Sequence, residues 1–261
     1  MGLGALLGLT AGVTLVAATA TFGIARLRGR YDTVDTFWGL GFALVAVVAF
    51  PFGSGPLPLR LVTAALTVVW GVRLSVHLHV RNHGKPEDPR YQRMVERAGA
   101  NPGLRMYGRV YLVQAVILWF VSLPVQFAMY GTGLGVLGWL GVAVWVLGFT
   151  FETVGDAQLS RFRADPDSRG KVLDTGLWRY TRHPNYFGDA CVWWGLYLLA
   201  CSTWPGAATI LSPVVMTFTL ARGTGKPMLE KGMAQTRPGY ATYVERTSGF
   251  VPLPPKKLTR R

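Results

Sequence analysis

The chain has 261 residues, of which 50% are hydrophobic and only 15% are charged. Soluble domains carry about 25% charged residues, so this composition argues against a water-soluble enzyme. The formal net charge is +14, but the Lys and Arg residues lie between long apolar blocks rather than along one face of a soluble fold. Juxtamembrane loops are the usual place for such cations, and we expect no nucleic-acid partner.

The apolar residues form blocks long enough to cross a bilayer, which takes about 20 residues. The sequence contains seven such blocks: Leu3–Ile24, Phe37–Phe52, Leu59–His79, Val110–Tyr130, Leu134–Phe151, Tyr186–Ser202 and Gly206–Ala221. The first block lacks a preceding basic stretch and a cleavage site, so we expect a retained helix rather than a signal peptide. The predicted fold is an all-α, polytopic membrane bundle of about seven transmembrane helices, forming one domain over residues 1–261.

Basic and uncharged loops alternate along the chain. The loops after the first, third and fifth blocks are basic, as is the C-terminal tail, whereas the connections between them carry almost no charge. The positive-inside rule therefore predicts an N-terminus outside and a cytoplasmic C-terminus, in the plasma membrane if the protein is bacterial. The long polar segments 81–109, 156–183 and 222–261 then face the cytoplasm. A polar cofactor should bind there.

The histidines and cysteines are weak evidence for a metal site. His77 and His79 are two residues apart, so they do not share a helix face. The two cysteines, Cys191 and Cys201, fall inside one apolar block. We therefore predict no metal site and expect both cysteines to be buried apolar residues.

A glycine pattern in the chain resembles a nucleotide-binding loop. Gly133-Leu-Gly135-Val-Leu-Gly138 matches G-x-G-x-x-G. This pattern binds dinucleotides only where it follows a strand and opens a helix in a βαβ unit. Here it opens a predicted transmembrane helix on the charge-free side, so we interpret the glycines as helix-packing residues.

Acidic and basic residues cluster where the fifth block ends. Glu152 and Asp156 are four residues apart and share a helix face. Their carboxylates could accept hydrogen bonds from a ribose or a base, and Arg161 and Arg163 could pair with phosphate. The alternative is an ordinary interfacial charge cluster with arginines that extend toward water.

The richest stretch runs from Gly176 to Asp189. Pro184 favours a helix start, which places Arg182 and free backbone N–H groups at a positive helix end suited to phosphate. Asn185 and Asp189 share a helix face, with Trp193 one turn further along. Polar groups inside a membrane bundle are costly without a partner, which suggests a binding site. The alternative is a helix cap in which Asp189 pairs with a neighbouring arginine.

The run Arg-His-Pro-Asn-Tyr-Phe-Gly-Asp at 182–189 resembles the steroid 5α-reductase family, particularly its bacterial DUF1295 group of uncharacterised membrane proteins. The resemblance covers most of the chain, is strongest over 152–189, and is weak in the first two helices. It implies that NADPH binds in the cytoplasmic half of the bundle. Residues 152–261 would form the most family-like, cofactor-binding part.

The resemblance also implies roles for individual residues. Asn185 and Asp189 would bind the nicotinamide end or its ribose, Asp156 the adenosine end, and Arg163 and Lys171 the phosphates, including the 2′-phosphate. The predicted cofactor-binding set is Asn82, Lys85, Arg90, Glu152, Asp156, Arg163, Lys171, Arg182, His183, Asn185, Tyr186, Asp189 and Trp193.

Two features depart from that family. The turn Asn-His-Gly-Lys-Pro at 82–86 is similar to the family's phosphate-contacting Asn-Arg-Gly-Arg-Pro turn, but Lys85 replaces the second arginine and loses its bidentate fork. The family's steroid enzymes polarise the substrate ketone with a Glu and a Tyr from the second and third helices, and the sequence identifies neither here. Asp35 is the acid at a comparable depth, and Arg73 and His77 are the candidate donors on the third helix.

The leading expectation is an enzyme that uses NADPH to reduce a carbon–carbon double bond in an apolar lipid or steroid-like substrate entering from the bilayer. A first alternative is an S-adenosylmethionine-dependent membrane methyltransferase of the isoprenylcysteine or phospholipid type. Those enzymes share an Arg-His-Pro-x-Tyr motif, and Glu230, Tyr240 and Tyr243 fit their Glu…Tyr-x-x-Tyr pattern. A second alternative is a non-catalytic lipid-binding membrane protein. Asn185 and the upstream Asp156 favour the reductase.

Overall fold

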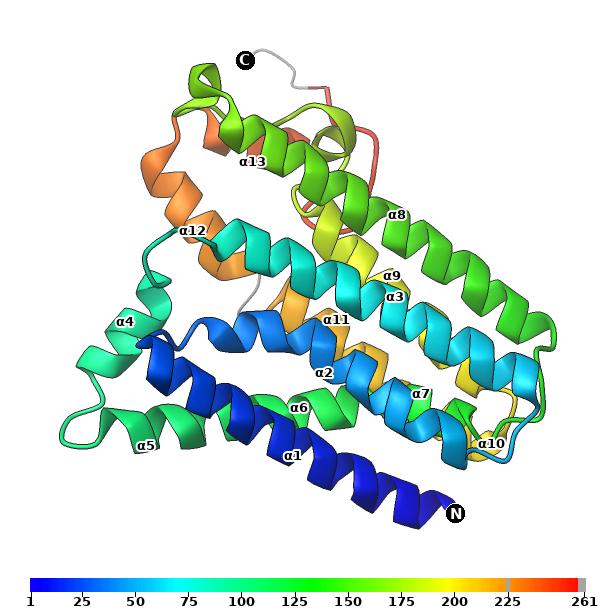
Figure 1. Cartoon of the computed structure of the whole chain (residues 1–261). Helices are drawn as coiled ribbons and strands as arrows, with labels where there is room; N and C mark the ends of the chain where they lie inside the picture. The colour runs from blue at the N-terminus through cyan, green and yellow to red at the C-terminus, as the bar shows by residue number, and fades with distance from the viewer. Residues whose placement is uncertain (224–225, 258–261) are drawn as a thin grey trace. The chain divides into compact units, whose positions relative to one another are not determined.

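The computed structural model describes residues 1–223 and 226–257, with the backbone alone at 226–229 (Figure 1). The described residues contain no strand, only an isolated β-bridge between Thr181 and Ser248, which confirms the predicted all-α class. The helices are α1 (Leu3–Arg28), α2 (Thr33–Ala49), α3 (Leu57–Asn82), α4 (Pro89–Glu96), α5 (Pro102–Met106), α6 (Val113–Val121), α7 (Leu123–Ala128), α8 (Val136–Ala164), α9 (Pro184–Ala200), α10 (Trp204–Ala207), α11 (Leu211–Ala221), α12 (Lys226–Thr236) and α13 (Tyr240–Arg246).

Six helical segments among the described residues are long and apolar enough to cross a membrane. They are Leu3–Arg28, Thr33–Phe52, Leu57–Asn82, Pro102–Ala128, Val136–Ala164 and Trp204–Ala221. The remaining predicted span corresponds to α9, which has 17 residues, at the lower limit of spanning length. The count of seven and the predicted orientation stay predictions.

The long helices expose apolar side chains along their length. In α1, only 22% of the apolar segment is buried, and Val16 is 70% exposed. Val47 in α2 and Val76 in α3 are each 57% exposed. Apolar side chains that cover a helix without being buried by protein suit a hydrocarbon environment, where the backbone bonds are satisfied within the helix. These are the features of a multi-pass membrane protein.

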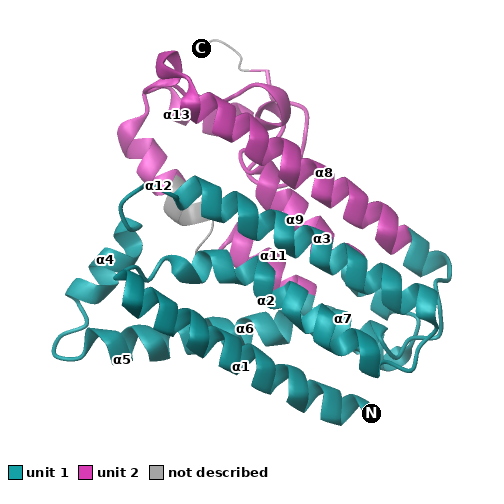
Figure 2. Cartoon of the chain, in the orientation of Figure 1, with its two compact units in different colours: residues 1–139, 196–212 teal, residues 140–195, 213–261 magenta. Residues whose placement is uncertain are grey.

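The chain divides into two compact units (Figure 2). Unit 1 comprises residues 1–139 and 196–212, and unit 2 comprises residues 140–195 and 213–261. Both units are discontinuous in sequence, because the chain leaves unit 1 after the first turn of α8, continues through the rest of α8 and most of α9 in unit 2, and then returns to unit 1.

In unit 1, α2 and α3 pack closely through a pair of glycines. A Cβ on Gly39 would collide with the backbone oxygen of Gly71, and the reverse also holds. The Ser75 hydroxyl strengthens the contact, since it donates to the Thr36 carbonyl (2.7 Å) and accepts from the Leu40 amide (2.9 Å). Small residues allow such close helix approach in membranes, so the first turn of α2 is fixed against α3.

In unit 2, α8 and α9 are held together in the same way. A Cβ on Gly148 would lie 2.5 Å from the Gly188 carbonyl oxygen, and one on Gly195 would lie 2.6 Å from that of Gly141. A Cβ on Gly155 would lie 3.2 Å from the Asn185 amide nitrogen. The backbones of the two helices therefore touch at several levels, and this contact fixes the start of α9 beside the polar part of α8.

Helix α8 is longer than its apolar block predicts. The prediction ended the span at Phe151, but the helix continues to Ala164 because no breaker intervenes before Asp165 and Pro166. Glu152 and Asp156 thus lie inside a helix rather than at its end. Their shared helix face, predicted from their spacing, holds.

Two local predictions need correction. Gly133 has φ of +146° and precedes α8 together with Gly135, and a Cβ on either would meet no described atom within 4 Å. The helix-packing interpretation is therefore wrong for these two glycines. The block Val110–Tyr130 is also not one α-helix, because a π-helical turn covers Tyr107–Leu112 and the helix breaks at Ser122, two residues before a proline.

Candidate functional site

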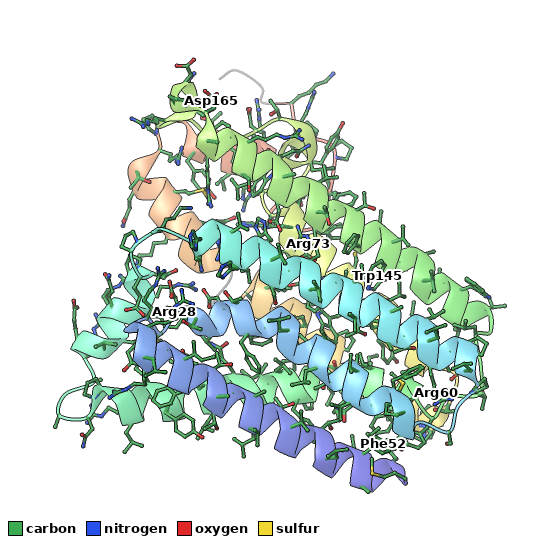
Figure 3. The ribbon with its side chains drawn as sticks, viewed as in Figure 1. Arg28, Phe52, Arg60, Arg73, Trp145 and Asp165 are labelled. Carbon is green, nitrogen blue, oxygen red and sulfur yellow. The ribbon has the colours of Figure 1, made fainter. Side chains whose placement is uncertain are left out.

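The polar groups of unit 1 gather at one end of its long helices. Figure 3 shows Arg28 where α1 finishes, and Arg60 and Phe52 at the opposite end of the α2–α3 pair. At that opposite end, the Arg60 guanidinium donates to the Phe50 carbonyl (3.0 Å) and lies over the Phe50 ring. The clustered polar end is the one predicted to face the cytoplasm.

A carboxylate and a tyrosine meet at this polar end. The Tyr91 hydroxyl, from α4, donates to Asp35 Oδ1 on α2 at 2.6 Å, and Arg90 Nη2 lies 3.6 Å from Asp35 Oδ2. Tyr91 is 6% exposed. Its burial, followed by the nearby Asp35 charge, raises the pKa of Tyr91. The hydroxyl therefore keeps its proton at neutral pH.

The loop before α4 holds Arg90 in place. The Asp88 carboxylate caps α4 by accepting from the Arg90 amide (2.8 Å), and it also accepts from Arg90 Nη2 (2.9 Å). Burial alone would raise the pKa of Asp88, but the hydrogen bonds from Arg90 outweigh burial and lower it. Arg90, predicted to contact cofactor, is thus shared between Asp88 and the candidate acid Asp35.

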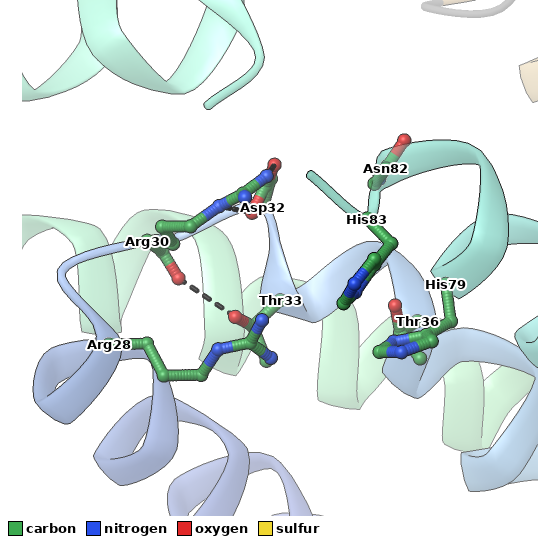
Figure 4. Close-up of a pocket in the computed structure, with 8 residues that line it drawn as sticks. All are labelled: Arg28, Arg30, Asp32, Thr33, Thr36, His79, Asn82 and His83. Carbon is green, nitrogen blue, oxygen red and sulfur yellow. Dashed lines mark hydrogen bonds and ion pairs between the residues drawn. The ribbon is translucent and has the colours of Figure 1, made fainter. Parts of the chain in front are cut away.

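A small cationic pocket lies at the same polar end of unit 1 (Figure 4). The Arg30 guanidinium pairs with Asp32 (2.7 Å) and donates to the Lys85 carbonyl (2.7 Å). The pocket holds about 20 Å³, enough for about one water molecule and too little for a nucleotide. Its lining includes the predicted Asn82, together with Arg28, Arg30, Asp32, Thr33, Thr36, His79 and His83.

The other predicted residues of unit 1 lie on α3. Arg73, labelled in Figure 3, and His77 are both half-buried. Tyr91 is the functional candidate that the sequence did not reveal. It lies 56 residues from Asp35 in the chain, and no local spacing connects a residue after the third apolar block to the start of the second helix.

In unit 2, the two motifs of the sequence analysis converge. Asn185 Nδ2 donates to Asp156 Oδ1 at 3.0 Å, and Asp156 is 6% exposed. The contact is possible because α9 begins at Pro184, as predicted, and because a Cβ-free Gly188 lets the α9 backbone reach that of Glu152. Asn185 Oδ1 also accepts from the Tyr186 amide (3.1 Å).

Arg182 and His183 precede α9 and are engaged by the C-terminal part of the chain. Arg182 Nε donates to Glu230 Oε1 (2.8 Å), and His183 Nε2 lies 3.0 Å from the same oxygen. Arg182 Nη1 also donates to the carbonyls of Val244 (3.1 Å) and Thr247 (2.6 Å). The Arg182 guanidinium thus ties the start of α9 to α12 and α13.

Two tyrosines of α13 complete this cluster. The Tyr243 hydroxyl donates to the Trp178 carbonyl (2.5 Å). Burial, followed by the Glu230 charge, raises the pKa of Tyr240 to about 12. Burial likewise raises the pKa of Tyr243. Both hydroxyls are therefore neutral at physiological pH.

The other predicted residues of unit 2 differ in accessibility. Arg163, near the end of α8, and Lys171 are exposed, and the Lys171 carbonyl accepts from Arg237. Asp189 is half-buried and Trp193 is fully buried on α9. The exposed cations remain accessible to an anionic ligand, whereas Trp193 contributes to the core of the unit.

Comparison with known proteins places the chain in a family. The sequence profile described as "Protein of unknown function (DUF1295)" matches residues 21–247. An uncharacterized protein of Schizosaccharomyces pombe is 23% identical over 278 aligned positions, covering 92% of this chain and 78% of that relative. No solved structure matches the chain. The matched range includes Asp35, Tyr91, Asp156 and Asn185, so these residues lie within the region shared with the family. Because the profile matches most of the chain, the chain belongs to the DUF1295 family.

Proposed function

We propose that this protein is a membrane-bound reductase that uses NADPH to saturate a carbon–carbon double bond in an apolar lipid or steroid-like substrate. The observation that carries the proposal is the hydrogen bond between Asp156 and Asn185 (3.0 Å). It joins the two motifs whose residues resemble the steroid 5α-reductase family. A carboxylate and an amide together offer the acceptors and donors that a ribose and a carboxamide require.

Charge supports a phosphate-bearing cofactor. Arg163 and Lys171 are exposed cations of unit 2, and cations of this kind pair strongly with phosphate. Arg182 is less suited to that role, because its guanidinium is already bonded to Glu230 and two carbonyls. The proposal assigns the phosphates to Arg163 and Lys171 because both residues are exposed.

The reaction also needs a proton. When bound, NADPH supplies hydride to one carbon of the double bond and becomes NADP⁺. The sequence candidates for the residue that acts on the other carbon, Asp35, Arg73 and His77, belong to unit 1, where the Tyr91 hydroxyl also donates to Asp35 at 2.6 Å. Arg90 Nη2, 3.6 Å from Asp35 Oδ2, stabilises negative charge on this acid–tyrosine pair.

Cofactor identity is the decisive test. We expect NADPH to raise the melting temperature of the detergent-purified protein by binding its folded state. Asp156→Ala and Asn185→Ala should each weaken this binding by about tenfold or more, which corresponds to about 1.4 kcal/mol. Matched controls are Asp167→Ala and Asn101→Ala, because both residues are exposed. No shift with NADPH, or equal losses in site and control variants, would contradict the proposal.

A second candidate is favoured by a specific contact. Arg182 and His183 of the Arg-His-Pro-x-Tyr motif meet Glu230, as the methyltransferase alternative expects of its motif residues. The same assay with S-adenosylmethionine and S-adenosylhomocysteine separates the two candidates. A shift with these ligands alone, lost in Glu230→Gln, would replace the reductase by a methyltransferase.

A further inference from the structure

Unit 2 has a second polar pocket, separate from the residues assigned to the cofactor. It has a volume of about 740 Å³ and lies between the segment 174–179 and the C-terminal segment. Its charged lining residues are Asp174, Arg179, Arg246, Lys256 and Lys257. The proposed reductase uses none of them.

Backbone hydrogen bonds hold the walls of this pocket together. The Leu253 amide donates to the Tyr180 carbonyl (3.0 Å), and the Lys256 amide donates to the Arg246 carbonyl (2.9 Å). The C-terminal segment is thus fixed at two points against the residues before α9 and the end of α13. Its lysines are therefore positioned by structure rather than carried on a loose tail.

The pocket carries an excess of positive charge. Four cations face one carboxylate, and Asp174 pairs with Arg246. Within the described part of the chain, no ion pair involves Arg179, Lys256 or Lys257. Like charges held close together repel one another, so an anion bound between these three side chains would stabilise the arrangement.

Apolar side chains border the same segments. Tyr180 is 44% exposed, Val251 53% and Leu253 54%. Leu253 and Tyr180 are the partners of a backbone hydrogen bond that fixes the C-terminal segment, and each is close in sequence to a residue that lines the pocket, Pro255 or Arg179. A ligand that contacts both features carries a phosphate and an apolar part.

We infer that this pocket binds the phosphate of an anionic membrane phospholipid, with the lipid chains beside Val251 and Leu253. Basic pockets next to membrane helices recognise anionic headgroups in this way. The inference is independent of the proposed reductase, because it concerns a lipid that is held rather than transformed. Inorganic phosphate shares the headgroup chemistry but lacks the apolar part, so the two sources can be separated.

The test uses the full-length protein purified in a neutral detergent. Thermal shift is measured with a short-chain phosphatidylglycerol, the matching phosphatidylcholine and inorganic phosphate. We expect phosphatidylglycerol to bind at least fivefold more tightly than the other two. The double variant Lys256→Gln/Lys257→Gln should lose that preference. The control Arg97→Gln/Arg169→Gln removes the same charge from two exposed positions outside the pocket and should retain it.

Each other outcome overturns the inference. Equal shifts with phosphate and phosphatidylglycerol would make this a free-phosphate site. Equal shifts with both lipids would show that the pocket does not distinguish an anionic headgroup from a zwitterionic one. An equal loss of phosphatidylglycerol affinity in the control variant would show that the net charge of the protein, and not this pocket, causes the preference. Affinity for NADPH, measured in the same variants, should not change; a parallel loss would assign the pocket to the cofactor instead of a lipid.

Discussion

Tyr91 is the residue whose placement adds most to the chemistry. Its hydroxyl is buried, keeps its proton and donates to a carboxylate on another helix. The family that this sequence resembles polarises its substrate with an acid and a tyrosine, and neither could be identified from sequence. Asp35 and Tyr91 form an acid–tyrosine pair within unit 1, in which the tyrosine comes from α4 rather than from the third helix.

We predict that Tyr91→Phe destabilises the protein by about 1–3 kcal/mol, because Asp35 loses the donor that satisfies it in a buried setting. Thermal unfolding measures the effect. Tyr180→Phe, at an exposed tyrosine, is the matched control and should leave stability unchanged. Equal stability of Tyr91→Phe and the unmodified protein would show that Asp35 does not depend on this donor.

Residue spacing predicted some of these contacts and missed others for a physical reason. The shared face of Glu152 and Asp156 and the helix start at Pro184 follow from local rules. The bond between Asp156 and Asn185 joins different helices, and the sequence motif only suggested that both belong to one site. Pairings between distant segments depend on helix packing, which spacing along one helix does not encode.

At the scale of elements, the close approach of α8 and α9 positions the candidate site of unit 2. Gly188 lies within the motif at 182–189, and a Cβ there would collide with the Glu152 backbone and lie 2.5 Å from the Gly148 carbonyl oxygen. Backbone atoms cannot move aside as a flexible side chain can. The glycine of this motif is therefore required for packing, and through packing for the contact between Asp156 and Asn185.

Gly188→Ala should accordingly destabilise the protein by about 1–3 kcal/mol and weaken NADPH binding together with stability. Gly232→Ala on α12 is the matched control, because a Cβ there meets no described atom within 4 Å and alanine favours a helix by up to about 1 kcal/mol over glycine. Unfolding in denaturant and cofactor titration provide the comparison. Equal stability of the two variants would show that α8 and α9 tolerate separation.

The long apolar blocks predicted several of the helices closely. The blocks at 3–24 and 59–79 became α1 and α3 with a few added residues. Hydropathy underestimates α8, because a helix needs only the absence of a breaker and can continue through polar residues into water. It also overlooks the break at Ser122, because hydropathy does not register how a proline interrupts backbone hydrogen bonding.

For the whole molecule, the alternation of basic and uncharged loops predicts an orientation in the membrane. In a variant whose two native cysteines are replaced by alanine, Ser54→Cys should react with a membrane-impermeant thiol reagent in intact cells. Arg97→Cys and Arg169→Cys should react only after permeabilisation, because their basic loops are predicted to be cytoplasmic. All three positions are exposed. The reverse labelling would invert the topology, and opposite labelling of Arg97→Cys and Arg169→Cys would change the number of spans between them.

The bonds from Arg182 impose an order on biosynthesis. Its partners, the carbonyls of Val244 and Thr247 and the carboxylate of Glu230, all lie C-terminal to it in the chain. A ribosome therefore releases α9 to the insertion machinery while this arginine is still hydrated and unbonded. The cluster can close only after α13 and Thr247 have left the ribosome, so this part of the fold is completed later than α9 is made.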